Sequence, residues 1–359
     1  MFIKLGKDTT LVQQFELMGD SIRTTILRRP NGIQLYKGEG SLYPDGTIRS
    51  MTAAVFRLGP NGELQKAAEN RLYTSGDSTF IENNVNGRRS TRSYQGRGFI
   101  ANDMDYTTFL MFPYLGHFAP SRNNDSITGK QLVLGGFRVF IIKRTGERSI
   151  RVGSNIMGNL NLFLNADGSI NTIDGIGSSL NFTATVKQNI NMDSLVNAMI
   201  SYQQQSGVMG PPTTRDTARA MVGSAKVEVD YWRPYMRGRK IFGGVVPWNR
   251  FWRTGANNAT QLRISQPIYF NEQKLDSGRY AIFTWPTETG WTFLINKQAT
   301  IWGTDYNPEF DLLRLPMKVE SIPGQVEQMK IQVIPSGDIG RIVIEWENTR
   351  ASIEFKTIK

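Results

Sequence analysis

The sequence contains no cysteine and one histidine, His117, among its 359 residues. Without cysteine the chain can form no disulfide, thiolate zinc site or iron–sulfur site, and it has no cysteine nucleophile. One imidazole cannot serve a site that needs two, which excludes most metallohydrolases, and a Ser-His-Asp mechanism would need His117 as its base. We therefore expect no bound cofactor and no tightly bound transition metal, because the softer ligands are missing.

Long apolar segments are also absent. Hydrophobic residues make up 39% of the chain, and no run approaches the roughly 18 residues expected of a membrane helix. We therefore predict no transmembrane segment. The start of the sequence lacks the charged leader, apolar core and cleavage site of a signal peptide. We expect either a cytoplasmic protein or a mature exported protein whose leader has been removed.

Positive charge is in excess. There are 42 Lys and Arg residues against 31 Asp and Glu residues, a formal net charge of +11, which favours anionic partners. The segment from Tyr231 to Asn271 is basic and contains no acidic residue. A nucleic-acid partner is disfavoured, because no RNP, helix-turn-helix or zinc pattern accompanies the charge.

The early sequence predicts β-strands. Apolar and polar residues alternate with period two in short segments rich in β-branched and aromatic residues, which is typical of half-buried strands. These segments are 9–15, 21–27, 33–36 and 51–58. The pairs Asp45-Gly46, Asn61-Gly62 and Asp167-Gly168 suit tight hairpin turns, because they tolerate positive φ. We expect an all-β protein whose N-terminal domain is an antiparallel meander or barrel-like sheet.

One helix and one linker stand out. Residues 192–204 place Leu195, Val196, Met199 and Ile200 on one face, and Asp193 or Ser194 could cap the start. The Gln-rich stretch that follows leads into Gly210-Pro211-Pro212, which is typical of a linker. All 7 tryptophans lie after it. We therefore predict two domains, 1–210 and 211–359, the second a β-sandwich.

The densest pattern of the second domain combines arginine, tryptophan, glycine and proline. Its blocks are Tyr231-Trp232-Arg233-Pro234, Arg237-Gly238-Arg239-Lys240-Ile241-Phe242-Gly243, Val246-Pro247-Trp248 and Trp252-Arg253-Thr254-Gly255-Ala256-Asn257. Their order resembles the domain-of-unknown-function 2911 family, and further matching blocks continue to Trp302-Gly303 and Trp346. The resemblance implies an exported bacterial protein, in the periplasm or at the cell surface, and it implies no activity. The N-terminal region more loosely resembles a β-rich region found upstream of this domain in some exported proteins.

The same residues suggest a ligand site. Arginine forks suit carboxylate, phosphate or sulfate, and tryptophan offers a flat face to a sugar ring. We therefore predict a non-enzymatic binding or envelope-associated module for an anionic or glycan ligand, with its site formed by Trp248, Trp252, Arg253, Asn257, Arg239 and Trp302. The alternative is that these aromatic rings fill the core while Arg253 bonds backbone carbonyls. The sequence leaves the oligomeric state open.

A second function class is a carboxylate-based hydrolase acting on glycans. It would need two acids facing one cleft, and Asp103 and Asp105 are one candidate pair. Asp305, Asn307, Glu309 and Asp311 alternate as the first ligands of a calcium loop do. The calcium pattern then fails, because Phe310 replaces the turn glycine, so we expect a solvated turn there.

Overall fold

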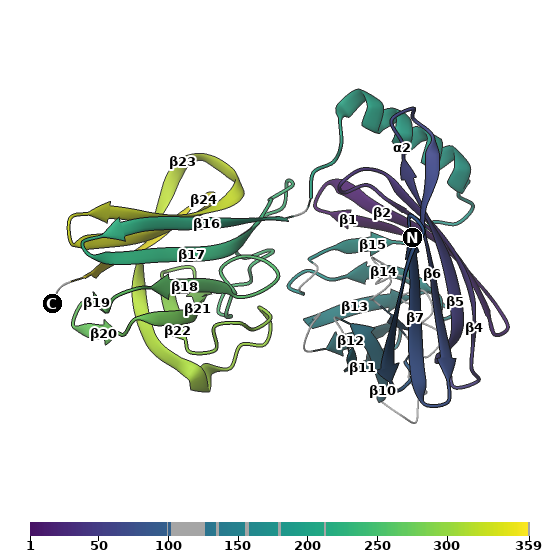
Figure 1. Cartoon of the computed structure of the whole chain (residues 1–359), viewed down its shortest axis with the longest axis horizontal. Coiled ribbons are helices and arrows are strands. Elements are labelled where there is room, and N and C mark those ends of the chain that lie inside the picture. The colour runs from purple at the N-terminus through teal and green to yellow at the C-terminus, as the bar shows by residue number, and fades with distance from the viewer. Residues whose placement is uncertain are drawn as a thin grey trace. The chain divides into compact units, whose positions relative to one another are not determined.

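The computed structural model describes residues 1–98, 100–101, 126–133, 136–154, 158–178, 181–211 and 213–357. His117, Asp103 and Asp105 lie outside the described residues. The chain divides into two compact units, one made from residues before 212 and one made mainly from residues after it. Both are built almost entirely from strands (Figure 1), so the predicted all-β class is confirmed.

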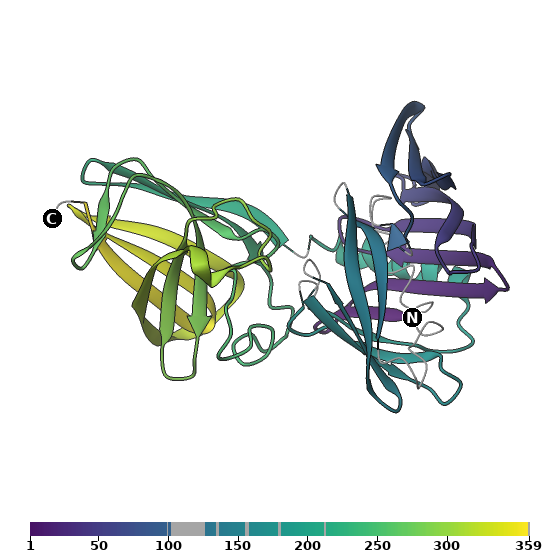
Figure 2. The ribbon, with the colours of Figure 1, turned by 90° about the horizontal axis from the view of Figure 1, so that it is seen from below.

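The first unit is one long antiparallel meander. Within the described residues its strands lie in the order β8 to β1 and then β15 to β9, and only β9 and β10 run parallel. The sheet curves strongly along its length (Figure 2), and β8 comes into contact with β11. The strands are β1 (Phe2–Leu5), β2 (Asp8–Met18), β3 (Ser21–Arg28), β4 (Gln34–Leu42), β5 (Ile48–Leu58), β6 (Leu64–Ser75), β7 (Ser78–Val85), β8 (Arg88–Gln95), β9 (Ile100–Ala101), β10 (Ser126–Val133), β11 (Gly136–Gly146), β12 (Ser149–Ser154), β13 (Gly158–Leu164), β14 (Ile170–Asp174) and β15 (Thr183–Thr185).

The predicted hairpin turns are confirmed. Gly46 has a φ of 81° and Gly168 a φ of 83°, in the left-handed region that glycine enters without strain. In both turns the aspartate before the glycine stabilises the turn by accepting a backbone N–H from two residues further along the chain. The Asp45 Oδ1 accepts the Thr47 backbone N–H at 2.9 Å, and the Asp167 Oδ1 accepts the Ser169 N–H at 2.9 Å.

Helix α2 (Met192–Ser206) covers one face of this sheet. Its Val196 packs with Val12, Leu27 and Leu35, and Leu195, Met199 and Ile200 join the same cluster. The apolar face expected from the sequence is therefore confirmed. The expected cap is wrong, because the cap is Asn191, whose Oδ1 accepts the Ser194 N–H at 2.9 Å. Asp193 and Ser194 instead lie in the first turn.

In the second unit the described strands form a sheet that folds over a large apolar core. The order is β16, β17, β18, β21, β22, β23, β24, β19 and β20. The long strand β23 pairs with β22 near its start and with β24 along the rest of its length. The elements are β16 (Thr213–Val222), β17 (Ala225–Pro234), β18 (Thr260–Ile264), β19 (Ile268–Phe270), β20 (Gln273–Leu275), β21 (Gly278–Pro286), β22 (Trp291–Asn296), η3 (Pro308–Phe310), β23 (Asp311–Ser336) and β24 (Ile339–Lys356).

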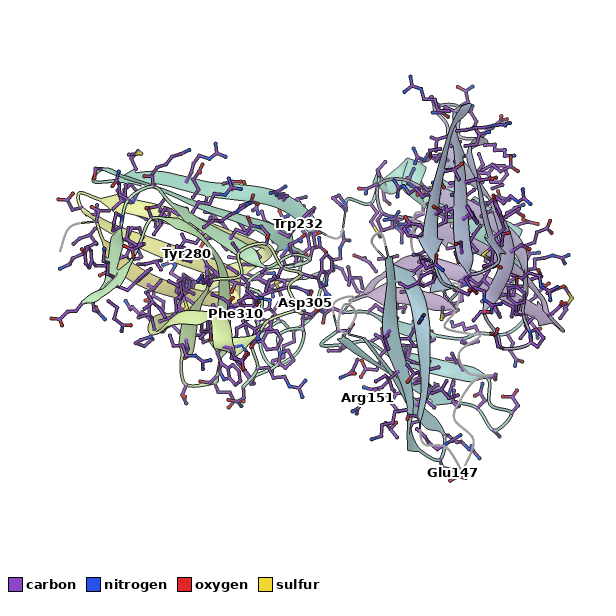
Figure 3. The ribbon with its side chains drawn as sticks, turned by 60° about the horizontal axis from the view of Figure 1, so that its bottom comes forward. Glu147, Arg151, Trp232, Tyr280, Asp305 and Phe310 are labelled. Carbon is purple, nitrogen blue, oxygen red and sulfur yellow. The ribbon has the colours of Figure 1, made fainter. Side chains whose placement is uncertain are left out.

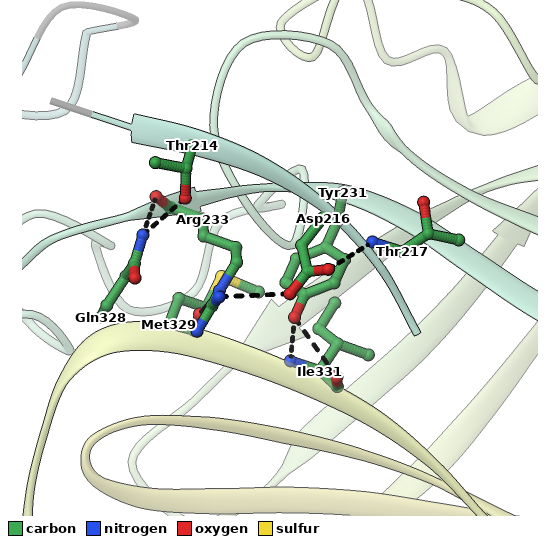
Figure 4. A network of polar contacts seen from close by, with 8 residues as sticks. All are labelled: Thr214, Asp216, Thr217, Tyr231, Arg233, Gln328, Met329 and Ile331. Atoms are coloured by element: carbon green, nitrogen blue, oxygen red, sulfur yellow. Dashed lines mark hydrogen bonds and ion pairs between the residues drawn. The ribbon is translucent and has the colours of Figure 1, made fainter. Parts of the chain in front are cut away.

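Polar contacts join the two layers of this unit (Figure 4). The buried Tyr231 of β17 accepts the Ile331 N–H of β23 on its hydroxyl at 2.8 Å. Arg233 donates to the Met329 carbonyl at 3.0 Å and pairs with Asp216 at 3.1 Å. Since β17 and β23 are not neighbours in the sheet order, the bonds from Tyr231 and Arg233 to the β23 backbone hold the folded sheet closed.

Among the described residues, no helix has the length and apolar character needed to cross a membrane.

Candidate functional site

Trp252 and Trp248 belong to the aromatic packing of the second unit. Trp252 is 9% exposed, stacks on Trp346 at 5.9 Å between ring centroids and meets Phe242 edge-on at 5.9 Å. Its indole Nε1 donates to the Gly255 carbonyl at 3.2 Å. Trp248 is half-buried and stacks on Phe242, with 6.1 Å between the ring centroids. These two rings contribute mainly to packing.

Arg253, Asn257 and Trp302 are brought together by the loop that follows Trp252. A Cβ at Gly303 would collide with the Arg253 side chain, so only glycine fits beneath it. Gly303 also donates its N–H to the Asn257 carbonyl at 3.0 Å, and the neighbouring Trp302 forms a β-bridge with Asn258. Arg253 is 8% exposed, and burial lowers the pKa of its guanidinium to about 10. The segment is thus tightly packed around a buried cation.

Arg239 lies in a separate setting. Its guanidinium donates to the Met236 carbonyl at 2.9 Å and to the Tyr235 carbonyl at 2.6 Å. Burial lowers the pKa of Arg239 to about 10, and the charge of Arg237 adds to that shift. These two bonds hold the turn after β17, and a third goes to the Asn181 carbonyl at 3.2 Å.

The acidic stretch from Asp305 to Asp311 is only partly a solvated turn. Asp305 and Phe310 lie on the surface of the second unit (Figure 3). Asp311, by contrast, has a side chain that is 3% exposed; it accepts the Tyr306 hydroxyl at 2.5 Å and pairs with Arg314 at 2.8 Å. Burial, followed by the bond to Asp311, raises the pKa of Tyr306. The part of the chain that the structure describes holds no group of three acidic or histidine side chains able to bind a metal ion.

The first unit contains a cavity of about 780 Å³ beside β2. One wall is the second half of β2, from Val12 to Leu17, and Met1 lies at its end. The opposite wall is formed by the β13–β14 turn with the start of β14 and by the segment after β15. Those walls contribute Asn165, Asp167, Ser169, Ile170, Asn171, Val186, Lys187, Gln188, Asn189 and Ile190, and Met192 of α2 completes the lining.

Strand β1 pairs with the part of β2 next to the cavity. Phe2 of β1 lies opposite Val12, and Met1 exchanges two backbone hydrogen bonds with Gln13 at 2.6 and 2.8 Å. Strand β2 continues to Met18.

A buried polar group belongs to the same lining. Gln13 is 1% exposed, and its Oε1 has no hydrogen-bond partner in the structure. The Thr24 hydroxyl donates to the Gln14 carbonyl at 3.0 Å, so toward Gln13 it can only accept. This fixes the Gln13 amide nitrogen toward Thr24, at 3.2 Å, and leaves the oxygen on the other side.

Comparison with known proteins identifies the second unit. Residues 213–355 match the model of the family described as "Protein of unknown function (DUF2911)". The second unit carries a DUF2911 domain. The resemblance seen in the sequence is thereby confirmed for this part of the chain. The buried arginine and tryptophans described above all lie in the DUF2911 domain.

Other comparisons add little. No curated protein matches the chain. A crystal structure of a DUF1089 family protein from Pseudomonas aeruginosa is 9% identical and covers 46% of this chain and 90% of its own, with a TM-score of 0.30. The HCR/D W1238A mutant is 8% identical and covers 97% of this chain and 92% of its own, with a TM-score of 0.11.

Sequence reasoning placed the site in the DUF2911 domain and missed the cavity of the first unit. The cavity is lined by β2, the β13–β14 turn and the segment after β15, which are far apart in the sequence, and no local pattern shows that they meet. The one available signal is the polar segment Lys187-Gln188-Asn189, in which two adjacent carboxamides could line a site.

Proposed function

We propose that this protein is a non-catalytic ligand-binding protein whose site is the cavity beside β2. The observation that carries the proposal is a cavity of about 780 Å³ lined by both carboxamide and apolar side chains of the first unit. Cavities of roughly 300–1,000 Å³ are usual for small-ligand sites. Polar amides and apolar side chains alternate around it, so it can orient a ligand as well as hold one.

The chemistry of the lining favours binding over hydrolysis. Asp167 is the one carboxylate among the described residues of the lining. It already accepts the backbone N–H and the hydroxyl of Ser169, at 2.9 and 2.6 Å. Glycoside hydrolysis uses a pair of carboxyl groups on either side of the bond that is cleaved. The cavity therefore lacks that machinery.

The setting of this function is a further part of the proposal. The resemblance to exported proteins supports a location in the periplasm or at the cell surface. The site of Trp248, Arg253 and Asn257 in the DUF2911 domain remains a second candidate.

The proposal is tested by closing the cavity from its exposed rim. Asn171 is exposed in β14, so Asn171→Trp should fill the cavity without disturbing the core. Thr91→Trp is the matched control, since Thr91 is exposed on β8 and does not line the cavity. Calorimetric titration would use four probes: cellotriose, an acetylated and amidated Thr-Val-Thr-Val-Thr peptide, citrate and decanoate.

At least one probe should bind the wild type and the Thr91→Trp variant with equal affinity. The same probe should bind the Asn171→Trp variant at least about tenfold more weakly, which is a loss of about 1.4 kcal/mol of binding free energy. If every probe fails to bind, or binds all three proteins alike, the proposed function is wrong.

A further inference from the structure

Tyr43 is held in the β4–β5 turn by hydrogen bonds of its backbone and of its side chain. Its backbone N–H donates to the Thr47 carbonyl at 2.8 Å, and its carbonyl accepts the Gly46 N–H at 2.8 Å. The Thr74 hydroxyl donates to the Arg49 carbonyl at 3.2 Å, so toward Tyr43 it can only accept. The Tyr43 hydroxyl therefore donates to Thr74, at 2.8 Å. These bonds fix the orientation of the half-buried ring.

Two arginines lie against this one ring. The guanidinium carbons of Arg49 and Arg97 are each 4.9 Å from the centroid of the Tyr43 ring, so the two charges are held within twice that distance of each other. Arg49 belongs to β5 and Arg97 follows β8, where the Gly98 carbonyl accepts the Ile48 N–H at 3.0 Å. A cation–π contact restricts a long side chain, so both guanidinium groups are partly ordered before a ligand arrives.

The N–H donors of both arginines are available to a ligand. Arg49 and Arg97 are exposed, and among the described residues neither guanidinium has a hydrogen bond or an ion pair. Arg71 offers a comparison, since it lies over the Tyr73 ring at 4.8 Å and also pairs with Glu82 at 4.0 Å. Beside Tyr43 the described residues supply two such arginines and no carboxylate paired with either.

Asp45 is the acidic residue of the same turn, and it is engaged within the turn. Its Oδ1 accepts the Thr47 hydroxyl at 2.6 Å and the Thr47 N–H at 2.9 Å. The bond from the Thr47 hydroxyl lowers the pKa of Asp45, and the charge of Arg97 adds to that shift. Asp45 is thus a negative charge near Arg97 that forms no ion pair with it, and the cluster keeps a net positive charge.

We propose that Arg49 and Arg97 bind a phosphate or sulfate group beside Tyr43. A guanidinium fork pairs with two oxygens of an oxyanion. A carboxylate has two oxygens, which one arginine occupies, whereas a tetrahedral anion offers oxygens to two arginines at once. The net charge of +11 favours such a partner. Neither arginine lines the cavity beside β2, so this site is separate from the proposed function and does not depend on it.

The test is calorimetric titration of the full chain at low ionic strength, where charges are least screened. The probes are inorganic phosphate, inorganic sulfate, glycerol 3-phosphate and acetate. Phosphate and sulfate should bind, and acetate should bind at least about tenfold more weakly, because it can satisfy only one fork. Glycerol 3-phosphate distinguishes two sources of the anion. Binding at least as tight as that of inorganic phosphate indicates an esterified group, and weaker binding indicates the free ion.

Conservative variants separate a built site from general positive charge. Arg49→Lys and Arg97→Lys keep the charge and lose the fork, so each should weaken phosphate binding by about tenfold. Arg57→Lys is the matched control and should change binding by less than about twofold. Arg57 is exposed on β5 like Arg49, and among the described residues it lies over no aromatic ring.

An acidic variant tests the sign of the electrostatics. Asp45→Asn keeps an oxygen that can accept the Thr47 N–H, and it removes a negative charge near the anion. It should therefore strengthen phosphate binding by about twofold to threefold. Unchanged or weaker binding in Asp45→Asn would place the anion away from Arg97 and contradict the proposal.

The remaining outcomes are equally decisive. The melting temperatures of the lysine variants should stay close to that of the wild type, because the substituted side chains are exposed. If neither phosphate nor sulfate binds, or if acetate binds as tightly, the proposal is wrong. If Arg57→Lys weakens binding as much as Arg49→Lys, or if Arg49→Lys and Arg97→Lys bind phosphate like the wild type, binding reflects general charge and the proposed site is wrong.

Discussion

Arg250 and Arg253 are three residues apart in the chain, and the fold gives them opposite environments. Arg250 is exposed, whereas Arg253 is 8% exposed and packs on Gly303. Burial disfavours the charged guanidinium and lowers the pKa of Arg253 to about 10, which leaves it charged at neutral pH. A buried cation is stable only if its N–H groups are hydrogen-bonded, so the planar arrangement of the guanidinium donors contributes more to stability than the positive charge alone.

This difference predicts the effect of two conservative substitutions. Arg253→Lys should destabilise the protein by about 1–3 kcal/mol, because lysine cannot reproduce the guanidinium fork and buried partners lose their bonds. Arg250→Lys should change stability by less than about 0.5 kcal/mol. Urea denaturation of both variants measures the difference. An unchanged stability of Arg253→Lys, together with loss of a glycan or anion that the wild type binds, would instead support the ligand site predicted from the sequence.

At the scale of elements, helix α2 shows how a cap defines where a helix begins. Asn191 has an extended backbone, with φ −79° and ψ 107°, and its side chain accepts the Ser194 N–H. Asp193 lies inside the first turn, where its charge interacts with the helix dipole. The sequence pattern located the helix correctly, but several polar residues near its start were equally able to cap it.

The cap assignment predicts unequal losses for two alanine variants. Asn191→Ala should reduce stability by about 1 kcal/mol, since one N–H of the first turn loses its partner. Asp193→Ala should cost about 0.3–1 kcal/mol at low salt and less at high salt, because only a screened dipole interaction is lost. Denaturation curves at low and high ionic strength separate the two effects. A larger loss for Asp193→Ala that persists in high salt would contradict Asn191 as the cap.

At the scale of the whole molecule, the chain between the two units is short and mostly exposed. Helix α2 ends at Ser206 and β16 begins at Thr213, and Val208 between them is 61% exposed. The described residues from Gly207 to Pro211 form no regular element. A protease cleaves extended, exposed segments, and it therefore cuts most readily in exposed connections such as this one.

We therefore predict that limited proteolysis cuts first between Gln203 and Thr214. Thermolysin at low ratio should yield two resistant fragments, and mass spectrometry of the early products locates the cut. Early cleavage between Trp232 and Trp302 would instead show that the DUF2911 domain is poorly folded. This experiment also tests the predicted domain limits of 1–210 and 211–359.

The sequence by itself determined the all-β class, the hairpin turns, the apolar face of α2 and the DUF2911 domain. These depend on neighbouring residues, because strand periodicity and positive φ at Gly46 or Gly168 are local properties. Only the tertiary structure decided which tryptophans fill the core and where the cavity lies. The cavity depends on β1 pairing with β2 on one side and with β15 on the other. The pairing of β1 with β15 joins segments far apart in the chain, which no local pattern records.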